Sequence, residues 1–428
     1  MAVRYLRPER NQPSWELIDL EALLAADHKA RIVWAYVEGL ELNALFEPIK
    51  TVEGGPGRPP PDPRVLLALW LYATLEGVGS ARQLDRLCDS DLAYRWLCGG
   101  VPVNYHGLSD FRVEHAAVLD RLLRESVTAL VTEGVVTLDE IAIDGTKIKA
   151  SAGRGSFRRA ARLATIEAAA RELVETLKAE VAADPAASET RRQAARRRAA
   201  EGVVARAAAA RQTLAKLREE RAESAKTHKQ AETKKNEPRA SRTDPDARLM
   251  RFADGAVRAG YNVQLAVLPQ SGIILTTAVT DRRNDAGLAG PMTEQVRTNF
   301  GITPQRVLAD THYATQADIV GLAAIGIEVY APAAPDKATA SPASQRKRAQ
   351  RRDAEPEAIK TWRARMAGEA GQLVYKRRAR IETVNGILKG RGLGVLQVRS
   401  MAKVACVVLL QALAHNLWRG HCLRQAAA

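Results

Sequence analysis

The sequence has few cysteines and no long apolar run, and both shortages restrict where the protein works. Its 428 residues include four cysteines, which lie far apart and form no Cys-x-x-Cys pair. We therefore expect a reducing compartment, without a disulfide framework or a standard zinc site. The longest apolar run, from Val65 to Leu75, is too short to span a bilayer, and the first residues hold no apolar signal core. These absences predict a soluble, cytoplasmic protein with no membrane partner.

What the sequence has in excess is positive charge. It contains 64 Lys and Arg residues against 49 Asp and Glu, giving a net charge of +15 and a pI of about 9.8. Such an excess points to a polyanionic partner, and nucleic acid is the commonest. The alternative is a basic protein that its charge keeps soluble. The length predicts two or three structural units.

Residues 1–135 are predicted to form a mostly helical region. Asp62 and Pro63 are a typical N-cap and first residue of a helix, and Ser80 is a second N-cap after a glycine-containing turn. This helix-turn-helix pattern is typical of DNA binding, but equally of an ordinary helical hairpin in a bundle. The arginines of this region that are placed to contact phosphates, or simply to be solvated, are Arg58, Arg82 and Arg112.

The pattern changes after residue 135. The segment VVTLDEIAIDGTKIKA alternates and is rich in β-branched residues, so it predicts a strand that ends near Asp144. Residues 155–239 then show helical stripes dominated by Ala and Arg, which predict a long helical hairpin or coiled-coil-like arm. Its length and charge suggest a role in dimerisation or in clamping DNA.

Strand signals resume at Tyr261. A β-hairpin is predicted from there to about residue 280, followed by alternating helices and strands, and by helices around 373–391 and 401–419. With the arm removed, residues 136–154 and 240–420 give an antiparallel hairpin beside crossover strands. The predicted class is mainly α plus α/β, with a mixed sheet whose order of elements is RNase H-like.

Two aspartates stand at predicted strand ends, Asp144 and Asp310. Carboxylates at the carboxyl ends of neighbouring strands converge on one crevice, where divalent metal ions relieve their mutual repulsion. Taken alone the signal is weak, because strand-end aspartates are common in turns.

The segment YKRRARIETVNGILK is more specific. If it forms one helix, Tyr375, Arg378, Glu382 and Lys389 fall within an arc of roughly 60°. A face with an aromatic, two cations and a carboxylate is hard to explain as core, although a solvated charged face is the common alternative. This face offers Glu382 as a third metal ligand, with cations beside it for a phosphate backbone.

These residues carry a resemblance. Tyr375, Arg378, Glu382 and Lys389 match at every spacing the Y-x-x-R-x-x-x-E-x-x-x-x-x-x-K signature of a large group of bacterial insertion-sequence transposases. The segments IAIDGTKIKA and VLADTHYAT resemble the two Asp motifs of that group, with His312 as a departure where relatives more often carry a small residue. The resemblance covers nearly the whole chain except the arm.

The resemblance implies a DNA transposase with an RNase H-like catalytic domain. Asp144, Asp310 and Glu382 would form its DDE metal triad, binding two Mg²⁺ ions, with Mn²⁺ as a substitute. They would support cleavage at the element ends and strand transfer into target DNA. Arg378 and Lys389 would grip phosphates, and Tyr375 would stack on a base or sugar. The expected partners are double-stranded DNA and a second copy of the chain, in the bacterial nucleoid.

Other functions stay open on the sequence alone. An inactive DNA-binding protein descended from a transposase would lack Mg²⁺-dependent cleavage. A structure-selective nuclease built on the same sheet would cleave without joining ends. A coiled-coil scaffold would explain the arm but not the strand motifs.

Overall fold

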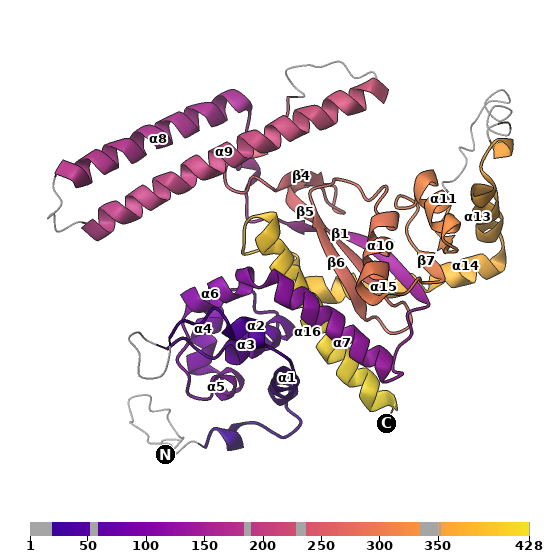
Figure 1. Ribbon diagram of the computed structural model, residues 1–428, viewed down its shortest axis with the longest axis horizontal. Coiled ribbons are helices and arrows are strands. Elements are labelled where there is room, and N and C mark those ends of the chain that lie inside the picture. The colour runs from indigo at the N-terminus through magenta and orange to yellow at the C-terminus, as the bar shows by residue number, and fades with distance from the viewer. Residues whose placement is uncertain are drawn as a thin grey trace, which may run out of the picture.

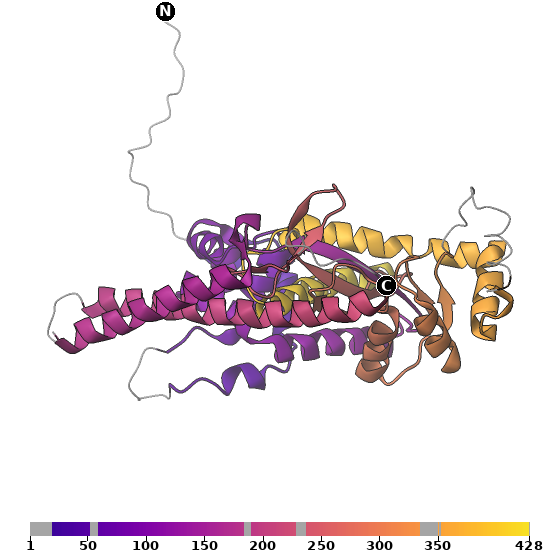
Figure 2. The ribbon, with the colours of Figure 1, turned by 90° about the horizontal axis from the view of Figure 1, so that it is seen from above.

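The computed structural model describes residues 19–51, 59–183, 190–227, 237–333, 350 and 352–427. Within them the chain forms a group of N-terminal helices, a mixed sheet covered by further helices, and a projecting helical hairpin (Figure 1). Viewed from above, the hairpin and the sheet extend along one long axis (Figure 2). Most of the predicted loop at 333–356 lies outside the described residues.

The N-terminal helices follow the predicted capping residues. Asp62 accepts the backbone N–H of Arg64 at 2.8 Å, Pro63 opens the next helix, and Ser80 accepts the N–H of Gln83. The second predicted helix is split, because Asp91 ends one helix and caps another. The helices are α1 (Lys29–Glu38), α2 (Asn43–Phe46), α3 (Pro63–Leu75), α4 (Ala81–Ser90), α5 (Leu92–Cys98) and α6 (Tyr105–Glu114).

The sheet has the predicted mixed topology. Its strands are β1 (Glu140–Lys149), β4 (Arg248–Arg251), β5 (Val257–Val267), β6 (Ile274–Thr280), β7 (Arg306–Leu308) and β8 (Glu328–Tyr330). β5 pairs antiparallel with β1 on one side and with β4 and β6 on the other. On the other side of β1, β7 pairs with β1 in parallel, and β8 pairs in parallel with β7. An antiparallel hairpin beside parallel crossover strands is the RNase H-like order that the sequence predicted.

Helices cover both faces of the sheet. Ile141 and Ile143 of β1 belong to a core with α7 (Ala116–Thr132), α10 (Ala289–Phe300), α11 (Gln316–Ala324) and α13 (Glu357–Ala367). Ala142 and Ile148 of β1 belong to a second core on the opposite face. That face is covered by α15 (Ala379–Leu388) and α16 (Met401–Ala427). The alternation along β1 therefore assigns even-numbered residues, including position 144, to the α15 face.

Helix α16 is a core helix. By length and composition it would cross a membrane, but 67% of its most apolar stretch is buried inside the protein. It runs beside α7 through the middle of the molecule (Figure 1). His415 accepts or donates a bond at 2.9 Å to the carbonyl of Gly272, and Asn416 bonds both backbone groups of Ile274. This long apolar helix thus ties the β5–β6 hairpin to the N-terminal helices.

A helical hairpin interrupts the chain between β1 and β4. It consists of α8 (Ala160–Ala183) and α9 (Thr190–Thr227), flanked by a two-stranded ribbon of β2 (Phe157–Arg158) and β3 (Ala240–Ser241). We call α8 and α9 together the arm. The sequence did not predict β4 or α13, since both are short and polar. All four cysteines are free.

Candidate active site

Asp144 lies in the interior of β1 and not at its end, which corrects the expectation from the sequence. The strand continues to Lys149 because β5 pairs with it along its whole second half. The parallel partner β7, however, pairs only as far as Ala142. Asp144 is therefore the second residue beyond the point where β7 leaves, where that side of β1 opens. Its side chain is 15% exposed.

Asp310 occupies the matching position on β7. Leu308 pairs with Ala142 in parallel register, so Asp310 and Asp144 each lie two residues beyond the same pair. Both therefore project to the α15 face of the sheet. Asp310 is half-buried, and its carboxylate accepts the N–H of Thr311 at 2.6 Å. The structure thus brings the two predicted aspartates to one edge, as the strand pattern implied.

The segment 373–391 is not one helix, which is a second correction. It forms α14 (Glu369–Lys376), then α15, then an irregular turn from Lys389 to Leu393. At the junction, tighter bonds link Arg378 N–H to the carbonyl of Tyr375 and Ile381 N–H to that of Arg378. The predicted 60° face is therefore interrupted, and Lys389 lies beyond the end of α15.

The junction lies beside β1. Its two consecutive arginines reach carboxylates four residues apart on the same face of β1. Arg377 lies 3.2 Å from the buried Glu140, and Arg378 lies 3.3 Å from Asp144. Glu140 is more than 200 positions away in sequence, so no local pattern predicts the break.

Arg378 connects two members of the predicted triad. One guanidinium nitrogen lies 3.3 Å from Asp144, and the other donates at 2.7 Å to Glu382. The second oxygen of Asp144 accepts the amide of Asn385 at 3.0 Å. The Arg378 side chain is 11% exposed and points toward these two carboxylates. Glu382, by contrast, is 63% exposed.

The charges around Asp144 oppose one another. Burial raises the pKa of its carboxyl to about 6, and the negative charges of Asp285 and Asp310 act in the same direction. The Arg378 guanidinium acts the other way. Tyr375 is half-buried near the same charges, and burial raises the pKa of its phenol. The site therefore gathers more negative charge than its single arginine offsets.

The donor set fits a divalent cation. Carboxylate oxygens are the ligands that hard cations prefer, and crowded carboxylates gain most from a bound cation. Among the described residues, no three His, Cys, Asp or Glu side chains lie close enough to form a ready metal cluster. Asp144 and Asp310 are held by the sheet, whereas Glu382 is turned toward Arg378 and solvent.

A polar cluster beside Asp144 was not predicted. Asp285 accepts the amides of Asn262 at 2.6 Å and Gln264 at 2.9 Å, and the Tyr313 hydroxyl donates to Gln264. A Cβ added to Gly145 would lie 2.5 Å from Asp285 and 2.8 Å from the Tyr313 hydroxyl. A side chain in place of Gly145 would therefore force the ends of Asp285, Gln264 and Tyr313 to shift. An isolated glycine inside a strand was the available sequence signal.

Of the three N-terminal arginines predicted to contact phosphates, the structure describes Arg82 and Arg112. Arg112 is buried against the Trp70 ring and donates to the carbonyl of Gly79, so it is not available to phosphate as predicted. Its burial lowers the pKa of the guanidinium to about 10. Arg82 is exposed and lies 4.7 Å from the ring of Tyr105. Arg58 lies outside the described residues.

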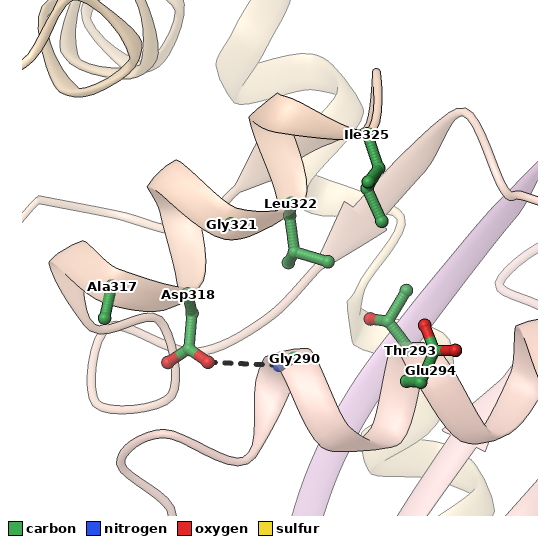
Figure 3. A pocket seen from close by; sticks show the side chains of 8 residues that line it. All are labelled: Gly290, Thr293, Glu294, Ala317, Asp318, Gly321, Leu322 and Ile325. Atoms are coloured by element: carbon green, nitrogen blue, oxygen red, sulfur yellow. Dashed lines mark hydrogen bonds between the residues drawn. The ribbon is translucent and has the colours of Figure 1, made fainter.

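A pocket of about 230 Å³ lies between α10 and α11, apart from the three carboxylates (Figure 3). Its acids have structural partners. Asp318 caps α11 and accepts the N–H of Gly290, while Glu294 pairs with Arg297. We assign it no ligand.

Comparison with known families decides the class of protein. Residues 222–417 match the transposase DDE domain, and residues 18–114 match a second transposase domain, DUF772. The two matches do not overlap. The chain belongs to the DDE transposases of insertion sequences.

The two family matches contain two of the three predicted triad residues. Asp310 and Glu382 lie inside the matched DDE domain, whereas β1 with Asp144 and nearly all of the arm lie between the two matches. No curated protein and no solved structure matches the chain. The enzyme is thus a DNA transposase of a family that depends on divalent metal.

Proposed function

We propose that Asp144, Asp310 and Glu382 are the metal-binding triad with which this transposase cleaves element ends and joins them to target DNA. The observation that supports this most directly is the Arg378 bridge between Asp144 on β1 and Glu382 on α15. Two carboxylates from distant parts of the chain share one cation at the sheet edge, beside Asp310. Oxygen ligands favour Mg²⁺, with Mn²⁺ as a substitute.

Each triad member has its own support from the chain. β5 and the Asn385 amide hold Asp144, and the turn after β7 holds Asp310. The apolar side of α15 seats Glu382 through Ile381 and Val384, which are buried. Bound divalent ions would lower the pKa of the attacking water and stabilise the leaving oxygen.

The flanking residues would handle DNA. Lys389 is exposed just beyond α15, where its ammonium can meet a phosphate. Tyr375 is half-buried next to the site and offers a ring edge to a sugar or base. Arg378 would hold Asp144 and Glu382 in position in the free enzyme and turn to phosphate when cations and DNA enter. Exposed Arg82 is a further phosphate contact, as is Arg58.

We further propose the division of labour along the chain. Residues 1–135 would bind DNA and assemble the complex, 136–154 with 240–420 would form the catalytic domain, and 155–239 the inserted arm. Cleavage of paired ends requires two active sites, so a homodimer on DNA in the cytoplasmic nucleoid is expected. Mass photometry of the end complex would show two chains; a monomer both free and on DNA would contradict the dimer.

The test uses the element's own ends and Mg²⁺, comparing wild type with Glu382→Gln. The variant keeps the size of the side chain and removes its charge, so the fold and DNA binding should remain while strand transfer disappears. Unchanged strand transfer in the variant would refute the triad. Two other results would change the function itself: cleavage without joining indicates a nuclease, and binding without any cleavage indicates an inactive transposase.

A further inference from the structure

The arm is fixed to the catalytic sheet by an ion cluster at its base. Arg248 of β4, whose side chain is 6% exposed, lies 3.3 Å from Glu220 of α9 and 2.7 Å from Asp281. Asp281 directly follows β6, and Lys216 of α9 lies 3.8 Å from it. Arg248 and Asp281 form the buried part of this cluster within the sheet, and Glu220 and Lys216 of α9 bind to it from the more exposed side, so the cluster holds the base of α9 beside β4.

The two helices of the arm pack along their length. Leu163 of α8 lies with Leu214 and Leu217 of α9 in a small core. Glu167, whose side chain is 8% exposed, accepts Arg171 at 2.7 Å and Arg211 at 2.9 Å. The apolar side chains are thereby used inside the arm. Among its described residues, the large apolar side chain left exposed is Leu173.

Charge is distributed unequally between the two helices. α9 contains eleven Lys and Arg residues against four Glu, whereas α8 contains three against four Glu. The excess is not neutralised within the arm. Arg196 and Arg198 are exposed and Arg206 is half-exposed, and none of the three has a carboxylate partner among the residues that the structure describes. We call these three residues the arm arginines.

We propose that the arm arginines bind the phosphate backbone of duplex DNA, extending the enzyme's grip beyond the active site. This rests on DNA being the substrate. The rise of a helix places Arg196 and Arg206 about 15 Å apart, a length along which duplex DNA carries about nine phosphate charges. The arm arginines, which have no carboxylate partner among the described residues, therefore suit the phosphates of duplex DNA. A second copy of the chain fits less well, because the slightly acidic α8 cannot balance α9 and no broad apolar face remains.

The projection of the arm supports a contact with DNA away from the triad. Figure 1 places α8 and α9 above β4, and in both views the hairpin runs outward to the left of the sheet. The 38 residues of α9 form a rod about 57 Å long, which exceeds one turn of the double helix at about 34 Å. Contacts of this kind carry no base information, so they would strengthen binding to any sequence.

The test measures the salt dependence of binding by the full-length protein. Fluorescence anisotropy with a 40-base-pair duplex of arbitrary sequence gives Kd over a series of KCl concentrations. The variant is R196Q/R198Q/R206Q, and R196K/R198K/R206K is the matched control that keeps the charge. Each lost phosphate contact makes the slope of log K against log salt shallower by about 0.9. Arg196 and Arg198 point about 200° apart on α9, so one duplex meets at most two of the three arginines. We expect the Gln variant to be shallower by about 1 to 2 and to bind several-fold more weakly, with the Lys control unchanged.

Two outcomes would overturn the inference. An unchanged slope in the Gln variant would exclude phosphate contacts. An unchanged slope together with loss of a dimer in sedimentation velocity would identify the arm as a self-association surface. Failure of the proposed triad gives a different result, since Glu382→Gln then retains strand transfer whatever the arm does. The E172Q/E175Q/E180Q variant of α8 removes the same number of charges from the arm, and its slope should not become shallower.

Discussion

The contact between β1 and α15 and the arm use charged side chains in opposite ways. At β1, Arg377 and Arg378 are each engaged by a buried or nearly buried carboxylate, and both oxygens of Asp144 have partners. On α9, the arm arginines are exposed or half-exposed and have no carboxylate partner among the residues that the structure describes. Ion pairs inside the protein hold the site residues in a fixed geometry. Surface cations without a carboxylate partner can instead bind a negatively charged partner molecule. We therefore expect catalysis to depend on the contact between β1 and α15, and DNA affinity to depend on the arm. Variants should then change one property without the other.

The largest effect is expected from Asp144→Asn. Loss of an outer-shell partner alone typically reduces the activity of a metal site 10- to 100-fold, so loss of a ligand should reduce cleavage by more than about a hundredfold. DNA affinity should change less than about twofold, because the Asp144 side chain is only 15% exposed and both of its oxygens have partners inside the protein. The Gln variant of the arm arginines should bind DNA more weakly. It should still cleave normally when enough enzyme is present to saturate the DNA. Mg²⁺-dependent cleavage gels and anisotropy on the same samples measure both, and a joint loss in either variant would contradict the separation.

The second largest effect is expected on stability, from substitution of Arg248 at the base of the arm. Arg248→Met leaves Asp281 without its closest cation in a partly buried position, which we expect to cost about 3 kcal/mol of unfolding free energy. The matched control is Arg258→Met, whose pair with Asp254 is exposed, so its cost should stay below about 1 kcal/mol. Thermal unfolding and limited proteolysis of the arm report the difference. Equal behaviour of the two variants would mean that the arm is not fixed through Arg248.

Acid should weaken the core helix α16 through His415. Burial lowers the pKa of this imidazole from 6.5 to about 4, despite its bond to Gly272. Below about pH 6.5 the unfolded chain takes up a proton that the folded chain does not, so stability falls as the pH falls, by up to about 3 kcal/mol near pH 4. His415→Gln should be less stable at pH 7.5 but lose less stability on going to pH 5. Unfolding at both pH values measures this, and parallel losses would argue against it.

A pair of glycines gives the smallest effects and opposite signs. Gly145→Ala would bring a methyl group within 2.5 Å of Asp285, which overpacks the cluster and should cost about 1–3 kcal/mol. Gly202→Ala in α9 meets only the flexible end of Arg206 at 3.1 Å and should gain up to about 1 kcal/mol from helix propensity. Their melting temperatures should move in opposite directions. A stable Gly145→Ala protein would show that the cluster is looser than described.

The local features of this fold were predictable from the sequence. The caps at Asp62 and Ser80, the β5–β6 hairpin and the alternation along β1 depend on neighbouring residues, and all are confirmed. The mixed sheet followed from the order of these elements. The equivalence of Asp144 and Asp310 needed only the assumption that their strands are neighbours.

What failed depended on contacts between distant residues. The break between α14 and α15 follows from carboxylates on β1, and the burial of Arg112 follows from packing against Trp70. Asp285 joins the site through a loop that no periodic pattern marks. In each case the local sequence leaves a charged side chain free for solvent or ligand. The folded structure gives that side chain a partner inside the protein.

The central claim is that Asp144, Asp310 and Glu382 converge on bound metal. Fe²⁺ with ascorbate and peroxide generates hydroxyl radicals that cut the polypeptide next to the ion, and mass spectrometry locates the cuts. In the complex with end DNA, we predict cuts next to residues 144, 310 and 382 together, suppressed by excess Mg²⁺ and absent in Asp144→Asn. Cuts at other positions, or cuts at only one of the three, would contradict the shared site.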